Sequence, residues 1–148
     1  MKKLWLGFLG LCCAATLIAG SGSTTPDGWY DDFTVAQNKA KELKRPILLL
    51  LTGSDWCPFC QKLKKEALDT KEFKAYAQRN LILVYADVPR YAELPRELVK
   101  QNRKLAQKFG VRGYPTTIIL SPDGSEIGRI GGFARAYLDR VRKIVGKK

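Results

Sequence analysis

Two cysteines separated by two residues, Cys57 and Cys60, are the side chains of this sequence best suited to chemistry. A pair at this spacing can exchange disulfides, because one thiolate attacks a disulfide and the second thiol then attacks the mixed disulfide. An apolar run over 47–51 precedes the pair, and Pro58 suits the first turn of a helix. Unpaired N–H groups and the helix dipole would stabilise a thiolate there. We expect Cys57 to be an exposed nucleophile whose pKa is lowered to between about 3.5 and 7.5.

The same pair is also compatible with a metal site or with inert packing. Zinc normally takes four Cys or His ligands, and this chain has no histidine and 4 cysteines in all, two of them at Cys12 and Cys13. A zinc site would therefore need unusual carboxylate ligands or a second subunit. A Cu(I) carrier stays open, because soft metals accept two thiolates. Inert packing does not explain the strand-to-helix location, and the lack of histidine excludes Ser/His/Asp and Cys/His hydrolases.

The N-terminus has the pattern of a secretory signal peptide. Lys2 and Lys3 precede an apolar run over 4–19, and small residues follow over 19–23. We expect a signal peptide over 1–22 and one domain over 23–148. Retention of the segment as a membrane anchor is an alternative, although the run is shorter than the roughly 20 residues of a spanning helix. Cleavage would remove Cys12 and Cys13, so the mature domain would have no structural disulfide framework.

The formal net charge of +12 indicates a basic protein. An excess of basic residues often indicates nucleic-acid binding, but here the basic residues are scattered along the chain, and an export signal argues against that function. We expect solvated helix faces and no nucleic-acid partner, with attraction to acidic partners or a membrane surface as the lesser alternative. Membrane contact is expected only if the N-terminal segment is retained, and the protein is expected to be a monomer.

Hydrophobic periodicity predicts an alternation of helices and strands that would hold the cysteine pair at a strand-to-helix junction. The expected elements are a helix over 33–43, a strand over 47–51, a helix from 57 to about 67, a helical piece to about 78, a strand over 81–88, a helix ending at 109, strands over 116–120 and 126–130 joined by a tight turn, and a helix over 133–144. Asp69 with Glu72 resembles a capping box. Whether 28–30 adds an edge strand stays open.

This order predicts an α/β fold. Strands separated by helices favour parallel pairing, and the final hairpin makes the sheet mixed. The expected architecture is a mixed central sheet flanked by helices that ends in a β-hairpin and a C-terminal helix.

The sequence from Trp29 to about Phe133 resembles the thioredoxin superfamily, specifically the exported bacterial thioredoxin-like (thiol:disulfide interchange) proteins. The resemblance is carried by RPILL at 45–49, by TGSDWC at 52–57 and by FGVRGYPT at 109–116. The last of these is similar to the element that carries a cis-proline in thioredoxin and protein disulfide isomerase. The segment over 45–57, which contains the first two stretches, and the segment over 109–116 are separate motifs in the right order, which makes the resemblance specific. It implies a thioredoxin-like fold.

The resemblance implies roles for the cysteine pair and for the segment at Pro115. Cys57 would be the attacking cysteine, Cys60 the resolving cysteine, and Pro115 the cis-proline beside them. The Tyr114 main chain would pair with an extended substrate segment. An ordinary trans proline at the start of a strand is the alternative for Pro115. Trp56 and Phe59 would shield the centre and contact substrate, although core packing is an equal alternative for Trp56.

Two positions depart from the family pattern. Leu51 stands where cytoplasmic thioredoxins often carry a buried aspartate, and Tyr85 stands where they carry a nearby lysine. The proton acceptor for Cys60 is therefore missing or is supplied by water or by another group, with Asp87 and Asp55 as candidates.

The expected function is thiol–disulfide exchange in the cell envelope through a Cys-Pro-Phe-Cys centre, with no cofactor and no metal. The absence of histidine between the cysteines favours a reductase-like or isomerase-like redox poise. Expected partners are cysteine-containing envelope proteins and a redox partner protein, in the periplasm or at the envelope. The C-terminal Gly146-Lys147-Lys148 is not a retention address of the endoplasmic reticulum. The alternative is a non-catalytic binding module, either a Cu(I) carrier or a chaperone.

Overall fold

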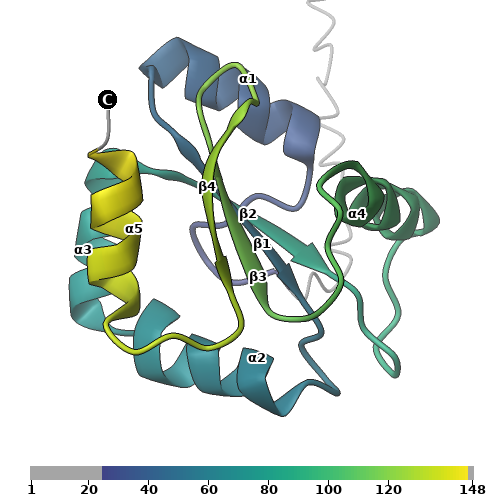
Figure 1. Cartoon of the computed structure of the whole chain (residues 1–148). Coiled ribbons are helices and arrows are strands. Elements are labelled where there is room, and N and C mark those ends of the chain that lie inside the picture. The colour runs from purple at the N-terminus through teal and green to yellow at the C-terminus, as the bar shows by residue number, and fades with distance from the viewer. Residues whose placement is uncertain (1–24, 147–148) are drawn as a thin grey trace, which may run out of the picture.

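The computed structural model describes residues 25–146, which form a sheet with helices on both faces (Figure 1). The predicted signal peptide over 1–22 and the expected start of the domain at 23 lie outside these residues. The elements in chain order are α1 (Phe33–Leu43), β1 (Ile47–Thr52), α2 (Pro58–Leu63), the π-helical turn η1 (Lys64–Leu68), α3 (Lys71–Asn80), β2 (Ile82–Asp87), α4 (Arg96–Lys108), β3 (Thr116–Leu120), β4 (Glu126–Gly131) and α5 (Tyr137–Val145).

The sheet of the described residues has the strand order β2-β1-β3-β4. Strand β1 pairs in parallel with β2, so that Leu49 lies opposite Val84, and it pairs antiparallel with β3, where Leu49 lies opposite Ile118. Strand β4 closes the sheet as the antiparallel partner of β3. The predicted mixed sheet with a final hairpin and helix is therefore confirmed.

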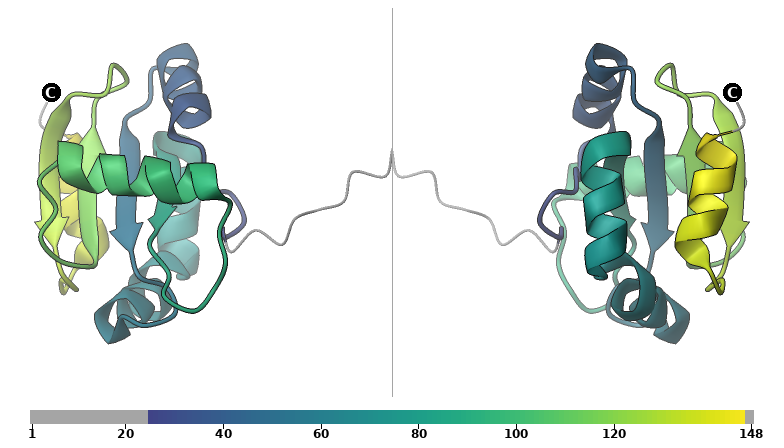
Figure 2. Two further views of the ribbon diagram at one scale, coloured as in Figure 1. Left: turned by 90° about the vertical axis from the view of Figure 1, so that its right-hand side faces the viewer. Right: turned by 90° about the vertical axis from the view of Figure 1, so that its left-hand side faces the viewer.

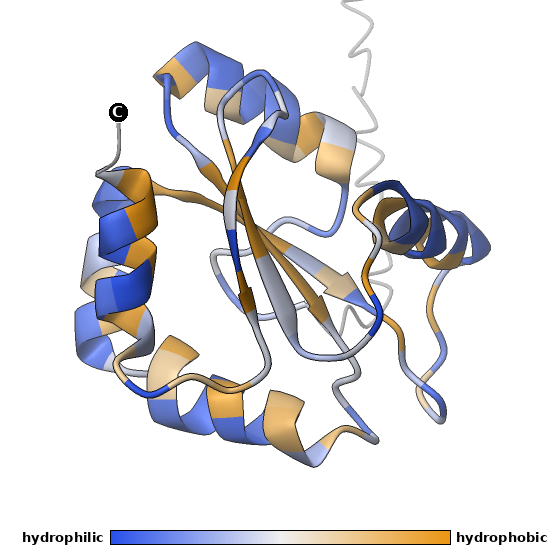
Figure 3. Ribbon diagram, viewed as in Figure 1, coloured by the Kyte–Doolittle hydropathy of each residue, from blue (hydrophilic) through white to orange (hydrophobic). Residues whose placement is uncertain are grey.

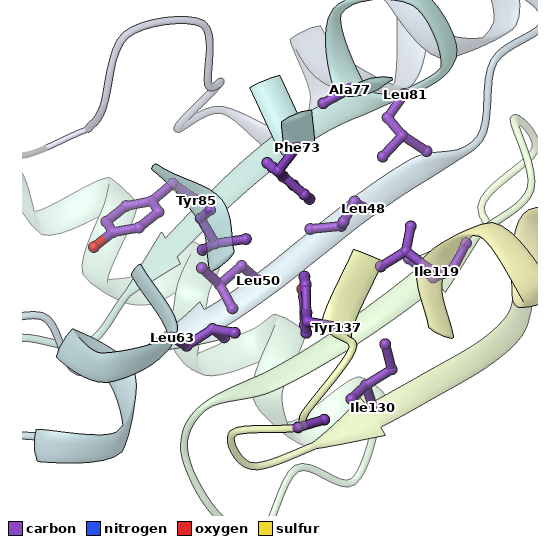
Figure 4. Packing of buried hydrophobic residues seen from close by; sticks show 13 residues of the cluster. Leu48, Leu50, Leu63, Phe73, Ala77, Leu81, Tyr85, Ile119, Ile130 and Tyr137 are labelled. Atoms are coloured by element: carbon purple, nitrogen blue, oxygen red, sulfur yellow. The ribbon is translucent and has the colours of Figure 1, made fainter. Parts of the chain in front are cut away.

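Alternate side chains of β1 enter two separate cores, which explains why residues 47–51 of this strand are all apolar. Leu48 and Leu50 face the core under α2, α3 and α5, where Phe73 and Tyr137 lie (Figure 4). Ile47, Leu49 and Leu51 face the core under α1 and α4. Figure 2 shows the helices on the two sides of the sheet, and Figure 3 shows apolar strands between helices whose outer faces are hydrophilic.

Two predictions about helix boundaries are wrong. Thr70, and not Asp69, caps α3, because its hydroxyl accepts the Phe73 N–H at 3.2 Å. Asp69 instead accepts a hydrogen bond from Lys64 at 2.6 Å, so the expected capping box with Glu72 does not form. The last helix begins at Tyr137, after Ala136 in a left-handed conformation. Phe133 packs against the core from the preceding loop.

Residues 28–30 form no edge strand, and only Tyr30 pairs with the sheet. Tyr30 makes a single parallel bridge to Val84, with backbone hydrogen bonds of 2.8 Å to Leu83 and Tyr85. The contact lies at the outer edge of β2 and extends no further as a strand. The chain thus reaches the sheet edge before α1 begins.

Candidate active site

The cysteine pair lies where β1 ends and α2 begins, as predicted. Cys57 and Cys60 form a disulfide with their Cα atoms 5.2 Å apart. Cys57 is the N-cap of α2, and Pro58 occupies the first turn. The expectation that Cys57 is exposed is wrong for this disulfide form, because both cysteines are 4% exposed. The segment around Tyr114 lies against the sulfur of Cys57.

Backbone N–H groups point at both sulfur atoms. The Cys60 N–H donates to Sγ of Cys57 at 3.2 Å, and the Gly53 N–H donates to Sγ of Cys60 at 3.4 Å. The first of these is the capping interaction of α2. A thiolate at Cys57 would receive the same N–H with a stronger bond, because charge-assisted hydrogen bonds are about twice as strong as neutral ones.

The segment around Pro115 lies beside the disulfide, although 57 residues separate Tyr114 from Cys57 in the sequence. The Tyr114–Pro115 peptide bond is cis, as the resemblance implies. The Tyr114 carbonyl oxygen lies 3.6 Å from Sγ of Cys57. The Pro115 carbonyl oxygen accepts the Gly132 N–H at 2.8 Å, so that group is already paired. The two sequence motifs therefore meet at one point.

Trp56 and Phe59 occupy different environments. Phe59 is 62% exposed. Trp56 is half-buried, and its Nε1–H donates to the Val88 carbonyl at 2.8 Å. The indole meets the Tyr114 ring edge-on at a centroid distance of 5.7 Å, and it covers Gly53 so closely that a Cβ there would overlap it. Trp56 thus packs within the site, whereas Phe59 faces solvent.

Asp55 fixes a second loop against the cysteine segment, a feature that the sequence did not reveal. Its carboxylate accepts the N–H groups of Arg90, Tyr91 and Ala92 at 3.0, 2.7 and 2.8 Å. Desolvation acts to raise the pKa of Asp55, but these hydrogen bonds outweigh it, and the pKa lies below its usual value. An aspartate directly before a Trp-Cys motif could have suggested a loop cap, but its partner is 35 to 37 residues away.

Asp87 ends β2 beneath the same loop and is 2% exposed. Its carboxylate accepts the Ser54 N–H at 2.9 Å and the Ser54 hydroxyl at 2.5 Å, and its carbonyl accepts from the buried Asn102 at 2.8 Å. Burial raises the pKa of Asp87, the hydrogen bonds from Ser54 oppose the rise, and the charge of Asp55 adds to it. Within residues 25–146 neither Asp87 nor Asp55 forms a hydrogen bond with Cys60.

Replacing Asp87 with asparagine is expected to flatten the dependence of stability on pH. A raised pKa in the folded state means that the folded protein binds this proton more tightly than the unfolded chain. Ionising Asp87 therefore lowers stability as the pH rises from the ordinary aspartate pKa through the folded-state pKa. Asp87→Asn removes that loss, so its urea midpoint should fall less than that of the unaltered protein between about pH 4 and pH 8.

Ser54→Ala provides the matched comparison. It removes a hydrogen bond that lowers the pKa of Asp87, so the loss of stability should extend to higher pH. Parallel pH profiles for the unaltered protein and Asp87→Asn, both measured in the disulfide form, would contradict the assignment of a raised pKa to this carboxyl.

A small cavity of about 30 Å³ lies against Cys60, which is enough for one water molecule. Thr52 and Tyr85 are among the residues that line it, and their side chains are hydrogen-bonded to each other. Burial raises the pKa of Tyr85, the charges of Asp87 and Asp69 add to the rise, and the hydrogen bond with Thr52 opposes it. Tyr85 therefore carries no charge beside the cavity. Leu51, the other departure from the family pattern, packs in the core on the opposite face of the sheet.

Among residues 25–146 no group of three or more His, Cys, Asp or Glu side chains is arranged to hold a metal ion. No helix in this part of the chain has the length and apolar character needed to cross a membrane.

Comparison with known proteins identifies the relatives of this chain. Residues 33–143 match the model of the thioredoxin-like domain family. The chain is 30% identical over 159 residues to the disulfide bond reductase DsbH of Chlamydia pneumoniae, which covers 95% of this chain and 96% of the relative. It is 34% identical over 105 residues to the thioredoxin-related protein DsbJ of the same organism, covering 71% of this chain and 30% of that protein.

Solved structures agree with the sequence relatives. A structure of DsbH oxidoreductase aligns with a TM-score of 0.75 at 29% identity, over 85% of this chain and 92% of the other. A thioredoxin from Thermus thermophilus aligns with a TM-score of 0.61 at 22% identity, over 78% of this chain and 85% of the other, which supports the fold alone.

Proposed function

The chain belongs to the thioredoxin-like domain family, and we propose that it is an exported thiol–disulfide oxidoreductase that acts on protein disulfides in the cell envelope. The observation that carries the proposal is the cysteine pair at the start of α2, where the Cys60 N–H lies 3.2 Å from Sγ of Cys57. The similarity to a protein named a disulfide bond reductase over 95% of this chain supports the same activity.

The reduction of a substrate proceeds in two exchanges. The Cys57 thiolate attacks one sulfur of the substrate disulfide, whose S–S bond breaks as the mixed disulfide forms, and the departing substrate thiolate takes a proton. The Cys60 thiolate then attacks Sγ of Cys57, which forms the Cys57–Cys60 disulfide and releases the second substrate sulfur as a thiolate that takes a proton. The two cysteines supply both electrons, Cys60 supplies one proton, and solvent supplies the other because Cys57 starts as a thiolate. A dithiol redox partner restores the reduced pair by the reverse exchanges.

Cys60 must lose its proton before the second exchange. The carboxylate of Asp55 accepts hydrogen bonds from the loop at Tyr91, and that of Asp87 accepts them from Ser54, so neither is placed to accept that proton directly. In this proposal a water molecule in the cavity beside Thr52 and Tyr85 takes it. The Gly53 N–H, 3.4 Å from Sγ of Cys60, stabilises the thiolate that results.

The substrate contacts Phe59, Trp56, Tyr114 and Pro115. Phe59 lies between the two cysteines in the sequence and offers an exposed aromatic ring. The main chain of Tyr114 lies against Cys57 and pairs with an extended substrate segment. Trp56 also holds Tyr114 and the loop at Val88 in place through its ring contact and its Nε1–H hydrogen bond.

Export follows from the proposed signal peptide over 1–22, which places residues 23–148 outside the cytoplasm, in the periplasm or attached to the envelope. The partners are cysteine-containing envelope proteins and a redox partner protein, and the protein acts as a monomer. Retention of the N-terminal segment would add a membrane anchor without changing the chemistry.

A thiol titration against a glutathione series tests the proposal. The unaltered protein should show one reversible two-electron transition, with a midpoint between about −270 and −180 mV, the range from thioredoxin to disulfide isomerase. A midpoint near about −120 mV would contradict the reductase-like or isomerase-like poise. Absence of any transition together with tight Cu(I) uptake would favour the alternative function, a non-catalytic metal carrier.

A further inference from the structure

The loop over 88–95, between β2 and α4, is fixed beside the redox centre. Asp55 binds three of its N–H groups, and Trp56, the neighbour of Cys57, binds the Val88 carbonyl. Figures 1 and 2 show this loop beside the first turn of α2. A loop whose backbone is already fixed loses less conformational entropy when a partner binds.

Aromatic side chains face solvent on both segments. Among the large apolar side chains of residues 25–146, Tyr91 and Phe59 are the most exposed, at 79% and 62%. Tyr91 belongs to the fixed loop, and Phe59 lies between the two cysteines. Exposed aromatic rings on fixed backbone are the groups that contribute most at protein interfaces.

Three exposed cations belong to α2, to the fixed loop and to the segment before Tyr114. The Arg90 guanidinium lies 4.1 Å from the centroid of the Trp56 ring, and Lys62 Nζ lies 4.8 Å from that of Phe133. Arg112 is exposed and lines a groove of about 480 Å³ with Tyr114 and Pro115. In the part of the chain that the structure describes, none of the three cations forms a salt bridge, whereas five other basic residues do.

Of the carboxylates near these cations, Glu66 is exposed and lies one helical turn after Lys62, whereas the two aspartates closest to the redox centre are occupied or buried. Asp55 is occupied by three N–H groups, and Asp87 is 2% exposed. Glu93 is the exposed acidic residue of the loop, against three cations. The whole chain carries a formal charge of +12, so the long-range field also attracts acidic partners.

We propose that Phe59, Lys62, Arg90, Tyr91 and Arg112 form a basic aromatic rim that selects substrate proteins whose disulfide is flanked by acidic and apolar side chains. The two aromatic rings pack against the apolar side chains of the substrate, and the three cations form ion pairs with its carboxylates. The proposal rests on the proposed function, because the rim acts by delivering a disulfide to Cys57. It goes further in naming the chemistry of the substrate.

Two synthetic peptides test the rim. Each contains one intramolecular disulfide, and they differ only in carrying glutamate or lysine beside the cysteines. At low ionic strength the reduced protein should act on the glutamate peptide with a kcat/KM about tenfold higher than on the lysine peptide, since steering by a charged surface raises association rates by 10-fold or more. The ratio should decline toward one as salt is added.

In the double variant Arg90→Gln/Arg112→Gln, the ratio of kcat/KM for the glutamate peptide to kcat/KM for the lysine peptide should fall about fivefold at low salt. Activity on the lysine peptide shows that this variant is folded. Lys41→Gln is the matched control, because this exposed lysine lies on α1 at the opposite end of the sheet from α2 (Figure 1), and it should keep the ratio. Equal rates for the two peptides, or a preference that survives in the double variant, would overturn the rim. Failure to reduce either peptide would overturn the proposed function itself.

Discussion

Cys57→Ser is expected to abolish disulfide reduction, with a loss of about a thousandfold or more in the rate of insulin reduction by a dithiol. A hydroxyl at this position does not ionise near neutral pH and cannot form a disulfide, so the first exchange has no nucleophile. The turbidity of precipitating insulin chains measures the rate, with the uncatalysed reaction as the baseline.

Cys60→Ser provides the comparison that separates attack from resolution. In this variant Cys57 still attacks, but nothing resolves the mixed disulfide, so a covalent complex with substrate should accumulate. Non-reducing gel electrophoresis detects the complex, and a reductant should release it. A trapped complex with Cys57→Ser and none with Cys60→Ser would reverse the roles assigned to the two cysteines.

Phe73→Ala is expected to lower the free energy of unfolding by about 3–5 kcal/mol, since truncating a buried phenylalanine removes apolar burial and leaves a cavity. Phe73 is 1% exposed and packs between α3 and the sheet, with its ring centroid 6.1 Å from that of Tyr137 (Figure 4). A domain of this size is stable by about 5–15 kcal/mol, so this change removes a large part of the total. Urea unfolding of the disulfide form measures it.

Phe59→Ala is the matched control for stability, because the same residue type is 62% exposed there. Its urea midpoint should stay within the small range of surface substitutions, about 0.5 kcal/mol. Its rate with protein substrates should fall, since the ring belongs to the proposed contact surface. Equal losses of stability for Phe59→Ala and Phe73→Ala would contradict the described packing.

The sequence was sufficient for the fold because its signals are local and strong. The apolar run over 47–51, the helical spacing over 33–43 and Pro58 after the first cysteine each predict one element. The cysteine pair and the segment around Pro115 were found for the same reason, since each is a short motif. Their meeting, with Sγ of Cys57 3.6 Å from the Tyr114 carbonyl, was implied by resemblance to a family.

Contacts between segments far apart in the chain were beyond the reach of sequence patterns. Asp55 was considered as a proton acceptor, but it binds the backbone of the loop at Tyr91. Asp87 was considered for the same role, but it binds Ser54. Nothing in the sequence of either carboxylate shows its partner. The capping error at Asp69 has another origin, since Thr70 stands next to it and both residue types cap helices well.

The proposed attack of Cys57 on a substrate disulfide depends above all on the pKa of its thiol. Burial of the residue acts to raise it, whereas the Cys60 N–H and the start of α2 act to lower it, and the proposed chemistry requires the second effect to be larger. The most direct measurement is the rate of iodoacetamide alkylation at Cys57 of the reduced protein as a function of pH, followed by mass spectrometry. A half-maximal rate below about pH 7.5 is expected, and a half-maximal rate at about pH 8.5, the pKa of free cysteine, would contradict the proposed chemistry.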